Sequence, residues 1–393
     1  MFWSETMNFS FSKEEEDFHE EIRQFLRRES ELVEQVRIEI DDGAGQGPWS
    51  KELIRKLGAK GYLTPSWPEK YGGLGKPPIY TYIAHEEIAY LVGALIIVGV
   101  TFTGPSILLF GTEKQKEEYL PKIARGEVLF ALGYTEPQAG SDLVALEMRA
   151  VREGDYYIIN GQKTFNTAPH FADYHWLAAR TDPSASKHRG ISLFIVDLKS
   201  PGISIRPMIG LGKFRVNEVF YDDVKVPKEN LVGEENRGWY HMSTALSLER
   251  TWLVGITQRD FDELLSYARS TEQDGRLLAD DPMIKQEMAQ LAIEIEMARL
   301  LALRVTCLRD KGTAADCEAA MSKMFGSEVQ YRLEDEWMKI LSLYGSLEMG
   351  SAGVPLDGRV SRWYFRAVRD VLTRGTNEIM KAIIARRKLD LPR

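Results

Sequence analysis

The sequence has few of the residues that build disulfide frameworks, metal centres or membrane spans. Its only cysteines, Cys307 and Cys317, fall in helical-looking segments, so we expect reduced thiols in the cytoplasm and no disulfide framework. The six histidines form no paired helical ligand motif, and no metal is expected. The longest apolar run, residues 91–100, is too short to cross a bilayer.

Excess positive charge and nucleotide-binding loops are also lacking. The formal net charge is −8, which disfavours binding along a nucleic-acid backbone. No complete Gly-x-Gly-x-x-Gly or Walker-type loop occurs. The N-terminus has early acidic residues and no apolar core of signal length, so no secretory signal is expected. What remains is the composition of a globular protein long enough for two or three domains.

The hydrophobic period changes twice along the chain. Apolar residues recur at helical spacing up to about residue 125, with Phe18, Ile22 and Phe25 on one face. Strand-like runs then follow one another with no helix between them, and helical spacing returns after about residue 238. We therefore predict an α+β protein with an N-terminal helical domain (1–128), an antiparallel, barrel-like β domain (129–237) and a C-terminal helical domain (238–393).

Two local patterns give more detailed predictions. Asn160-Gly161 between apolar runs predicts a hairpin with a tight turn at these two residues. Met242, Leu246, Glu249 and Leu253 have the spacing of one helical stripe. A carboxylate on an apolar stripe has a raised proton affinity if it is desolvated, which suits a general base.

Several phrases in this order resemble the acyl-CoA dehydrogenase family over almost the whole chain. They are YTEPQAGSD (134–142), NGQKTFNT (160–167), HFADY (170–174), FYDDVKVP (220–227) and IARR (384–387). The resemblance implies a C-terminal four-helix bundle, an acyl-CoA substrate, FAD as cofactor and electron-transfer flavoprotein as partner. It also implies a homotetramer, or a heterotetramer with a paralogous subunit.

The resemblance implies FAD wedged between the β domain and the C-terminal helices. Phe165, where some relatives have tryptophan, would shield one flavin face. The alternative is that 135–142 only connects domains and that Thr376 only caps a helix, although capping and cofactor contact can coexist. The matching flavin contacts are Tyr134, Thr135, Gly140, Ser141, Phe165, Thr167, Thr376 and Glu378, and Ser141 also matches a substrate contact.

The catalytic base is the main departure from many relatives, because Arg374 stands where they carry a catalytic glutamate. Guanidinium stays protonated, so Arg374 cannot be the base. Isovaleryl- and long-chain-type relatives place their glutamate at the position of Glu249, which the resemblance makes the catalytic residue. The alternative for Glu249 is a buried ion pair with Arg250 or another helix. Arg250 matches an arginine beside the substrate, with surface pairing as its alternative.

Arg374 has three interpretations. In the first, it fills the space of the lost glutamate and its backbone amide still bonds the thioester oxygen. In the second, its planar guanidinium binds a carboxylate of a dicarboxylic acyl-CoA. In the third, it marks a flavin-binding subunit that does not dehydrogenate. Branched, aromatic and dicarboxylic thioesters are all candidate substrates, with residues 101–104 near the acyl pocket.

Two other functions compete with the dehydrogenase. One is a flavin oxidase or monooxygenase of the same superfamily, and the other is a non-catalytic partner in a heteromeric dehydrogenase. Relatives usually carry an Arg-x-x-Phe-Gly phrase that reaches the neighbouring subunit's cofactor, whereas residues 271–275 read TEQDG. This region lacks both the arginine and the aromatic residue.

Overall fold

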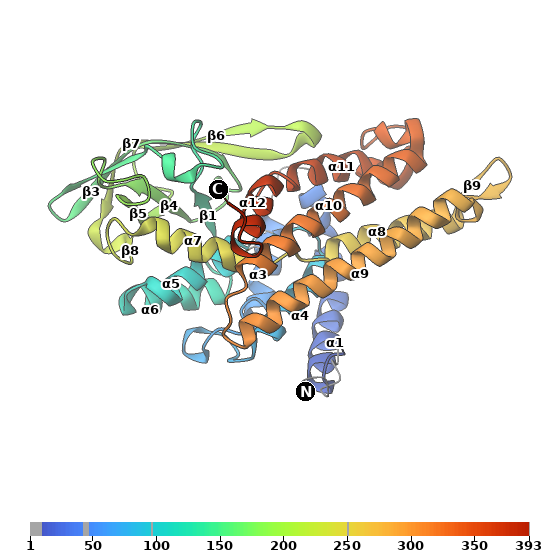
Figure 1. Cartoon of the computed structure of the whole chain (residues 1–393), viewed down its shortest axis with the longest axis horizontal. Helices are drawn as coiled ribbons and strands as arrows, with labels where there is room; N and C mark the ends of the chain where they lie inside the picture. The colour runs from blue at the N-terminus through green and yellow to red at the C-terminus, as the bar shows by residue number, and fades with distance from the viewer. Residues whose placement is uncertain (1–9, 42–46, 96, 250, 393) are drawn as a thin grey trace.

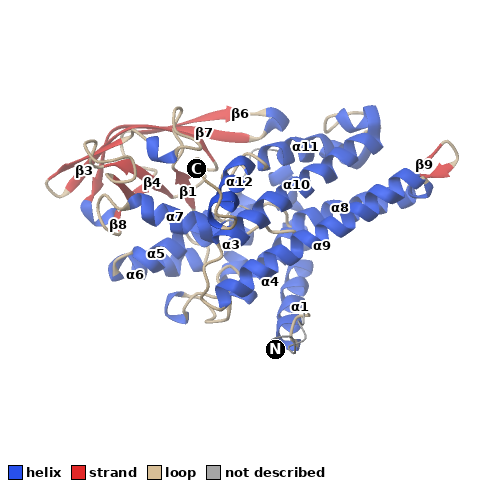
Figure 2. Cartoon of the chain, in the orientation of Figure 1, coloured by secondary structure: helices blue, strands red, loops and turns tan. Residues whose placement is uncertain are grey.

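Helices precede and follow a β domain in the chain. The computed structural model describes residues 10–41, 47–95, 97–249 and 251–392, with all of their side chains except those of 247–249. The β domain lies at one end of the molecule, and the long C-terminal helices extend toward the other end (Figure 1). The predicted succession of α, β and α is confirmed (Figure 2).

The N-terminal helices start at polar caps. Ser12 and Glu15 bond each other's backbone amides at the start of α1, and Thr112 and Gln115 do the same for α6. The Gln115 amide nitrogen also donates to the carbonyls of Glu229 and Leu231, at 2.7 and 2.9 Å, and so links α6 to the β domain. The helices are α1 (Lys13–Arg28), α2 (Ser30–Asp41), α3 (Pro48–Ala59), α4 (Pro78–Leu91), a π-helical turn (Gly99–Thr103), α5 (Gly104–Phe110) and α6 (Glu113–Ala124).

The β domain is one sheet in the order β6-β7-β3-β2-β4-β5-β8, with β1 paired to β4. Most pairs are antiparallel, as predicted, but β1 and β2 both run parallel to β4. The strands are β1 (Phe130–Gly133), β2 (Arg149–Glu153), β3 (Tyr156–Asn166), β4 (Tyr174–Arg180), β5 (Ile191–Asp197), β6 (Ile203–Ile209), β7 (Arg215–Pro227) and β8 (Leu231–Val232).

The hairpin turn predicted at Asn160-Gly161 is wrong. Both residues lie inside β3, and the reversal occurs one strand earlier, between Glu153 and Tyr156. The Asn160 side chain exchanges hydrogen bonds with Asp223 on β7, at 2.9 and 2.8 Å, and the pairing slips there by one residue. The partner strand satisfies the asparagine, so the chain forms a bulge instead of a turn.

The C-terminal domain is built from long helices. α8 and α9 run side by side and end in a small hairpin, β9–β10, which projects from the body (Figure 1). The elements are α7 (Gly238–Glu249), α8 (Gly255–Ser270), β9 (Glu272–Gln273), β10 (Arg276–Leu277), α9 (Pro282–Asp310), α10 (Asp316–Leu341), α11 (Arg359–Asp370) and α12 (Asn377–Arg387).

The predicted stripe through Leu253 is wrong at its last member, because α7 ends at Glu249. The Glu86 carboxylate on α4 accepts hydrogen bonds from the amides of Val254 and Gly255, which start α8. Burial raises the pKa of Glu86 to about 7, although these hydrogen bonds act to lower the pKa. The amides of Val254 and Gly255 therefore begin α8 and do not continue α7.

The hydrophobic cores join the domains. One cluster runs from α1 through the N-terminal helices to Phe130, Trp176 and Met242, while Trp337 and Trp363 centre a separate C-terminal cluster. None of the described helices combines the length and the apolarity needed to cross a bilayer.

Candidate flavin and substrate site

The two segments of the β domain that match flavin contacts lie side by side. The backbone amide of Thr164 donates to the Thr135 carbonyl at 2.9 Å. Next to it, the Lys163 ammonium lies 2.7 Å from a Glu136 carboxylate oxygen and 3.0 Å from the Tyr134 carbonyl. The structure therefore brings together segments that the sequence separates by almost 30 residues.

Glu136 and Lys163 form a buried ion pair beneath this surface. Their side chains are 3% and 0% exposed, so each charge depends on the other for solvation. Burial lowers the pKa of Lys163 to about 8, opposed by Glu136. The Glu136 carboxylate also accepts from the backbone amides of Glu147 and Met148, at 2.6 and 3.0 Å. One carboxylate thus ties both ends of the loop 136–148 to β3.

Phe165 is an exposed aromatic residue in a strained conformation. Its φ is +55°, in the left-handed region that bulky residues avoid, and its side chain is 60% exposed. The adjacent Asn166 is buried, with its amide donating to the Thr164 carbonyl. The pairing with β7 is also interrupted between Lys163 and Asn166. The sheet therefore presents the Phe165 ring outward, as required for packing on a planar cofactor.

The surroundings of Phe165 fit a flavin. The Oδ1 atom of Asn166 is buried and accepts no hydrogen bond within the described part of the chain. A cofactor donor would satisfy it. A Cβ atom on Gly140 would meet nothing within 4 Å, so this loop has room for a ligand. Ser141 is exposed, and Thr135 and Thr167 are half-buried.

Tyr134 differs from the other matched residues because its side chain lies in the core. Its hydroxyl accepts a hydrogen bond from Trp176 at 2.9 Å, and its ring packs edge-on against Phe102 at 5.6 Å. Phe102 belongs to the π-helical turn that overlaps residues 101–104. Tyr134 therefore links the flavin loop to the region expected near the acyl pocket.

The start of α12 is fixed by side chains of α10. Thr376 caps α12, accepting from the Ile379 amide at 3.3 Å, and Glu378 in the first turn is exposed. Asn377 is buried and accepts from Lys323 at 2.8 Å. Lys323 also donates to the Val371 carbonyl, at 3.2 Å. Burial, and then the charge of Arg374, lower the pKa of Lys323 to about 8.

Arg374 lies beside the corner that follows α7. Its guanidinium carbon is 4.8 Å from the centroid of the Trp252 ring, and its φ is +56°. Glu249 is the last residue of α7, three positions before Trp252. The side chain of Glu249 and all of Arg250 lie outside the described residues. The structure thus places Arg374 near the helix end that carries the candidate base.

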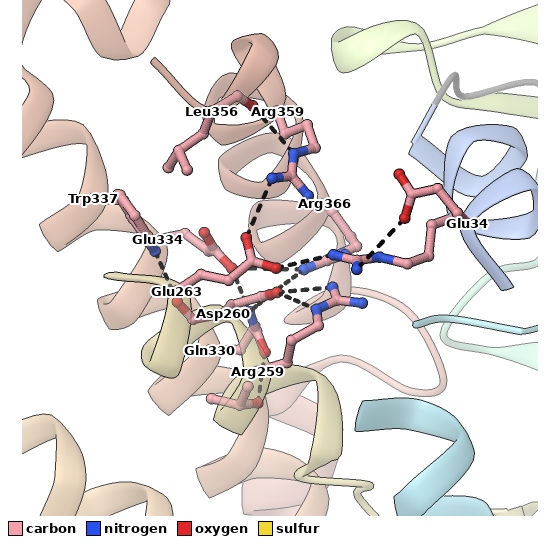
Figure 3. Close-up of polar contacts among 12 residues, drawn as sticks. Glu34, Arg259, Asp260, Glu263, Gln330, Glu334, Trp337, Leu356, Arg359 and Arg366 are labelled. Atoms are coloured by element: carbon pink, nitrogen blue, oxygen red, sulfur yellow. Dashed lines mark hydrogen bonds and ion pairs between the residues drawn. The ribbon is translucent and has the colours of Figure 1, made fainter. Parts of the chain in front are cut away.

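A second polar cluster holds the C-terminal helices together (Figure 3). Asp260 on α8 is fully buried and pairs with Arg259 at 2.8 Å and with Arg366 on α11 at 2.6 Å. These arginines keep the pKa of Asp260 below its usual value despite burial. Burial and Asp260 raise the pKa of Glu334 well above its usual value. Arg366 therefore fixes α11, whose end leads into the loop that carries Arg374.

The sequence interpretation missed Lys163, Lys323 and Trp252 as supports of this site. Lys163 lies within the phrase at residues 160–167, but the sequence alone does not show that it pairs with Glu136. Lys323 had a signal, because polar residues follow it at spacings of four, three and four within α10, on a face that is buried. They are Ser327, Gln330 and Glu334.

This architecture is that of a class of three-domain, flavin-binding oxidoreductases. Its parts are a helical domain, a sheet that presents an aromatic residue, and a second helical domain. Models of the N-terminal, middle and C-terminal domains of acyl-CoA dehydrogenases match residues 12–127, 131–224 and 236–389. The chain therefore belongs to the acyl-CoA dehydrogenase family. Its enzyme class, flavin-dependent oxidoreductases that act on the CH–CH bond of acyl-CoA, is as predicted.

Relatives align along nearly their whole lengths. Acyl-CoA dehydrogenase FadE29 of Mycobacterium tuberculosis is 36% identical, over 98% of this chain and 99% of the relative. The structure titled "Tcur3481-Tcur3483 steroid ACAD" has a TM-score of 0.90 at 32% identity, covering 98% of this chain and 100% of that one. A chain of the ChsE4-ChsE5 complex from Mycobacterium tuberculosis has a TM-score of 0.89 at 32% identity, with the same coverage.

Proposed function

We propose that this chain is an FAD-dependent acyl-CoA dehydrogenase that introduces an α,β double bond into an acyl-CoA thioester. The observation that carries the proposal is the exposed Phe165 ring, held on a strained backbone between two segments joined by the Glu136–Lys163 pair. Phe165 would lie on one face of the flavin. We keep residues 1–128, 129–237 and 238–393 as the proposed domains.

In this proposal Glu249 is the catalytic base that removes the proton from Cα. Glu249 is the last residue of α7, and a carboxylate is a common general base in enzymes. The bound FAD would accept the hydride from Cβ, and the two electrons would pass on to electron-transfer flavoprotein. The proton stays on Glu249 until it passes to solvent after the product has left.

The other matched residues would bind and orient the ligands. Thr135, Ser141, Thr167 and the backbones of Tyr134 and Gly140 would hold the flavin, together with Thr376 and Glu378 at the start of α12. Ser141 and Arg250 would also contact the substrate. The proposed substrates are branched, aromatic or dicarboxylic acyl-CoAs. The free thiols of Cys307 and Cys317 suit a cytoplasmic location.

The test is an anaerobic titration of the flavin-loaded protein with straight, branched, aromatic and dicarboxylic acyl-CoAs. We expect one class to bleach the oxidised flavin band, and the reduced enzyme to reoxidise slowly in air. Glu249→Gln should lower the bleaching rate by about 10²- to 10⁴-fold while acyl-CoA still binds, because only the base is lost.

The matched control is Glu20→Gln, which removes an exposed carboxylate from α1 and should leave the rate unchanged. Rapid bleaching by Glu249→Gln would remove this residue from the mechanism. Fast reoxidation by air would instead favour a flavin oxidase or monooxygenase.

A second candidate function is that of a flavin-binding subunit in a heteromeric dehydrogenase. Residues 271–275, at the start and turn of the β9–β10 hairpin, carry neither the arginine nor the aromatic residue of the phrase that reaches a neighbour's cofactor. A paralogous subunit would then supply both residues, giving a heterotetramer in place of a homotetramer.

A further inference from the structure

The loop before α12 carries an exposed cation, Arg374. Its side chain is exposed and forms no ion pair or hydrogen bond within the described part of the chain, although its guanidinium lies 4.8 Å from the Trp252 centroid. Its backbone has a φ of +56°, a conformation that is unfavourable for a long side chain. Its charge also disfavours the charged form of the buried Lys323. The Trp252 ring and the charge of Asp370 attract the guanidinium, but no carboxylate of the described residues pairs with it, which points to an external anion.

Trp252 gives the guanidinium a rigid support. The ring is 5% exposed, and its Nε1 donor is buried with no acceptor among the described residues. Gly326 on α10 lies so close that a Cβ atom there would come within 2.4 Å of the ring. The ring is therefore closely packed against α10, and the guanidinium lies over it with its N–H groups available.

The charged groups around Arg374 leave this cation available. Asp370, at the end of α11, accepts two hydrogen bonds from Arg369 on its Oδ1 atom, at 2.9 and 3.1 Å. Burial opposes the charged form of Asp370, yet Arg369 and then Arg374 keep its pKa below the usual value. Glu378, in the first turn of α12, is exposed. Lys323 adds a second positive charge beneath the loop.

We propose that Arg374 determines substrate specificity by binding a second carboxylate in the acyl group, so that the substrate is the mono-CoA thioester of a dicarboxylic acid. The inference rests on the proposed function, because Arg374 is near the helix end that carries the proposed base. A guanidinium fork pairs its parallel N–H groups with the two oxygens of a carboxylate. A methyl group at the same place would leave the cation unpaired.

The experiment compares two series of acyl-CoAs of equal chain length, one ending in a carboxylate and the other in a methyl group. It measures kcat/KM from flavin bleaching, and Kd of the matching 2-enoyl-CoA products by calorimetry. Wild-type protein should prefer the carboxylate series by about 10- to 100-fold, the range of a charge-assisted hydrogen bond. Arg374→Gly should abolish this preference, and Arg374→Lys should keep part of it because it retains the charge without the fork.

Glycine adopts the left-handed backbone of residue 374 without strain, so Arg374→Gly should fold. The matched control is Arg206→Gly, which removes an exposed arginine that also lies 4.8 Å from a ring centroid, that of Phe220 on β7. It should keep the wild-type preference.

Other results would overturn the inference. Equal weakening of both series by Arg374→Gly would mean that the arginine binds a phosphate of CoA. An unchanged ratio would mean that it only fills space. Calorimetry separates these results from failure of the proposed function. If the protein binds carboxylate products more tightly but no acyl-CoA bleaches the flavin, the role of Arg374 in specificity holds and dehydrogenation is refuted.

Discussion

Burial makes the Glu136–Lys163 pair far more important than a surface ion pair. Both side chains are almost fully enclosed, so neither charge can recover its hydration if the other is removed. The carboxylate has further donors in Gln138 and in two backbone amides, whereas the ammonium has one other acceptor, the Tyr134 carbonyl. The pair thus fixes the relative position of the two flavin segments.

We expect Glu136→Gln to reduce the free energy of unfolding by about 3–5 kcal/mol, because it leaves the Lys163 charge buried without its counter-ion. Lys163→Met should also destabilise the protein, but the double variant should lose much less than the sum. Urea unfolding of the four proteins gives the coupling free energy, and FAD titration should show weaker binding by the single variants.

The control for this cycle is the exposed Lys13–Asp17 pair on α1, where Lys13→Met and Asp17→Asn should change stability by less than about 1 kcal/mol. Additive losses at residues 136 and 163 would contradict a coupled pair.

At the residue scale, the sequence identified residues 134–142 and 160–167 because their phrases are local, and their contact with flavin stays a prediction. It could not predict that Lys163 is buried against Glu136, since that contact depends on how β3 packs under the loop. The left-handed φ of Phe165 also had no signal, because the residue type disfavours it.

Among the elements, α12 has a start that serves two purposes. Thr376 caps the helix with its hydroxyl, while Asn377 and Lys323 fix the same turn to α10. Free backbone amides at a helix start also bind phosphate, which is the proposed role of this turn toward FAD. Capping and cofactor binding respond differently to a negative charge, so they can be separated.

Thr376→Asp should keep the cap, because aspartate is at least as good an N-cap as threonine, and the free energy of unfolding should not fall. The Kd for FAD should rise by about tenfold or more, since like charges about 4 Å apart repel by about 1–4 kcal/mol. Thermal unfolding of the apoprotein measures the first effect, and flavin fluorescence quenching measures the second. Thr376→Ser should leave both unchanged, and normal FAD affinity of Thr376→Asp would place the phosphate elsewhere.

Elements with a long, unbroken period were predicted well, and their ends were not. The structure confirms the helical spacing predicted after about residue 238, with α9 at Pro282–Asp310 and α10 at Asp316–Leu341. The errors at Asn160-Gly161 and at Leu253 share a cause. In each case the side chain of a residue distant in sequence, Asp223 or Glu86, accepts a hydrogen bond that local rules assign to neighbours.

At the scale of the whole molecule, α7 joins the domains around the proposed site. It packs against β5, the π-helical turn and α10, and therefore touches all three parts of the chain. The β9–β10 hairpin, in contrast, projects away from the body of its own chain (Figure 1). In the second candidate function, the matching hairpin of a paralogous subunit supplies the residues that this one lacks.

We expect the chain purified alone to bind less than one FAD per subunit and to reach full loading with a paralogous subunit that carries the Arg-x-x-Phe-Gly phrase. Thr271→Arg combined with Asp274→Phe rebuilds that phrase ahead of Gly275 and should raise loading without a partner. The absorbance ratio gives FAD per chain, and light scattering gives the mass of the assembly. Glu272→Arg adds the same charge one residue out of register and should not raise loading. A stable homotetramer with one FAD per chain would contradict the heteromeric assembly, and it would mean that other residues of this chain bind the adenine end.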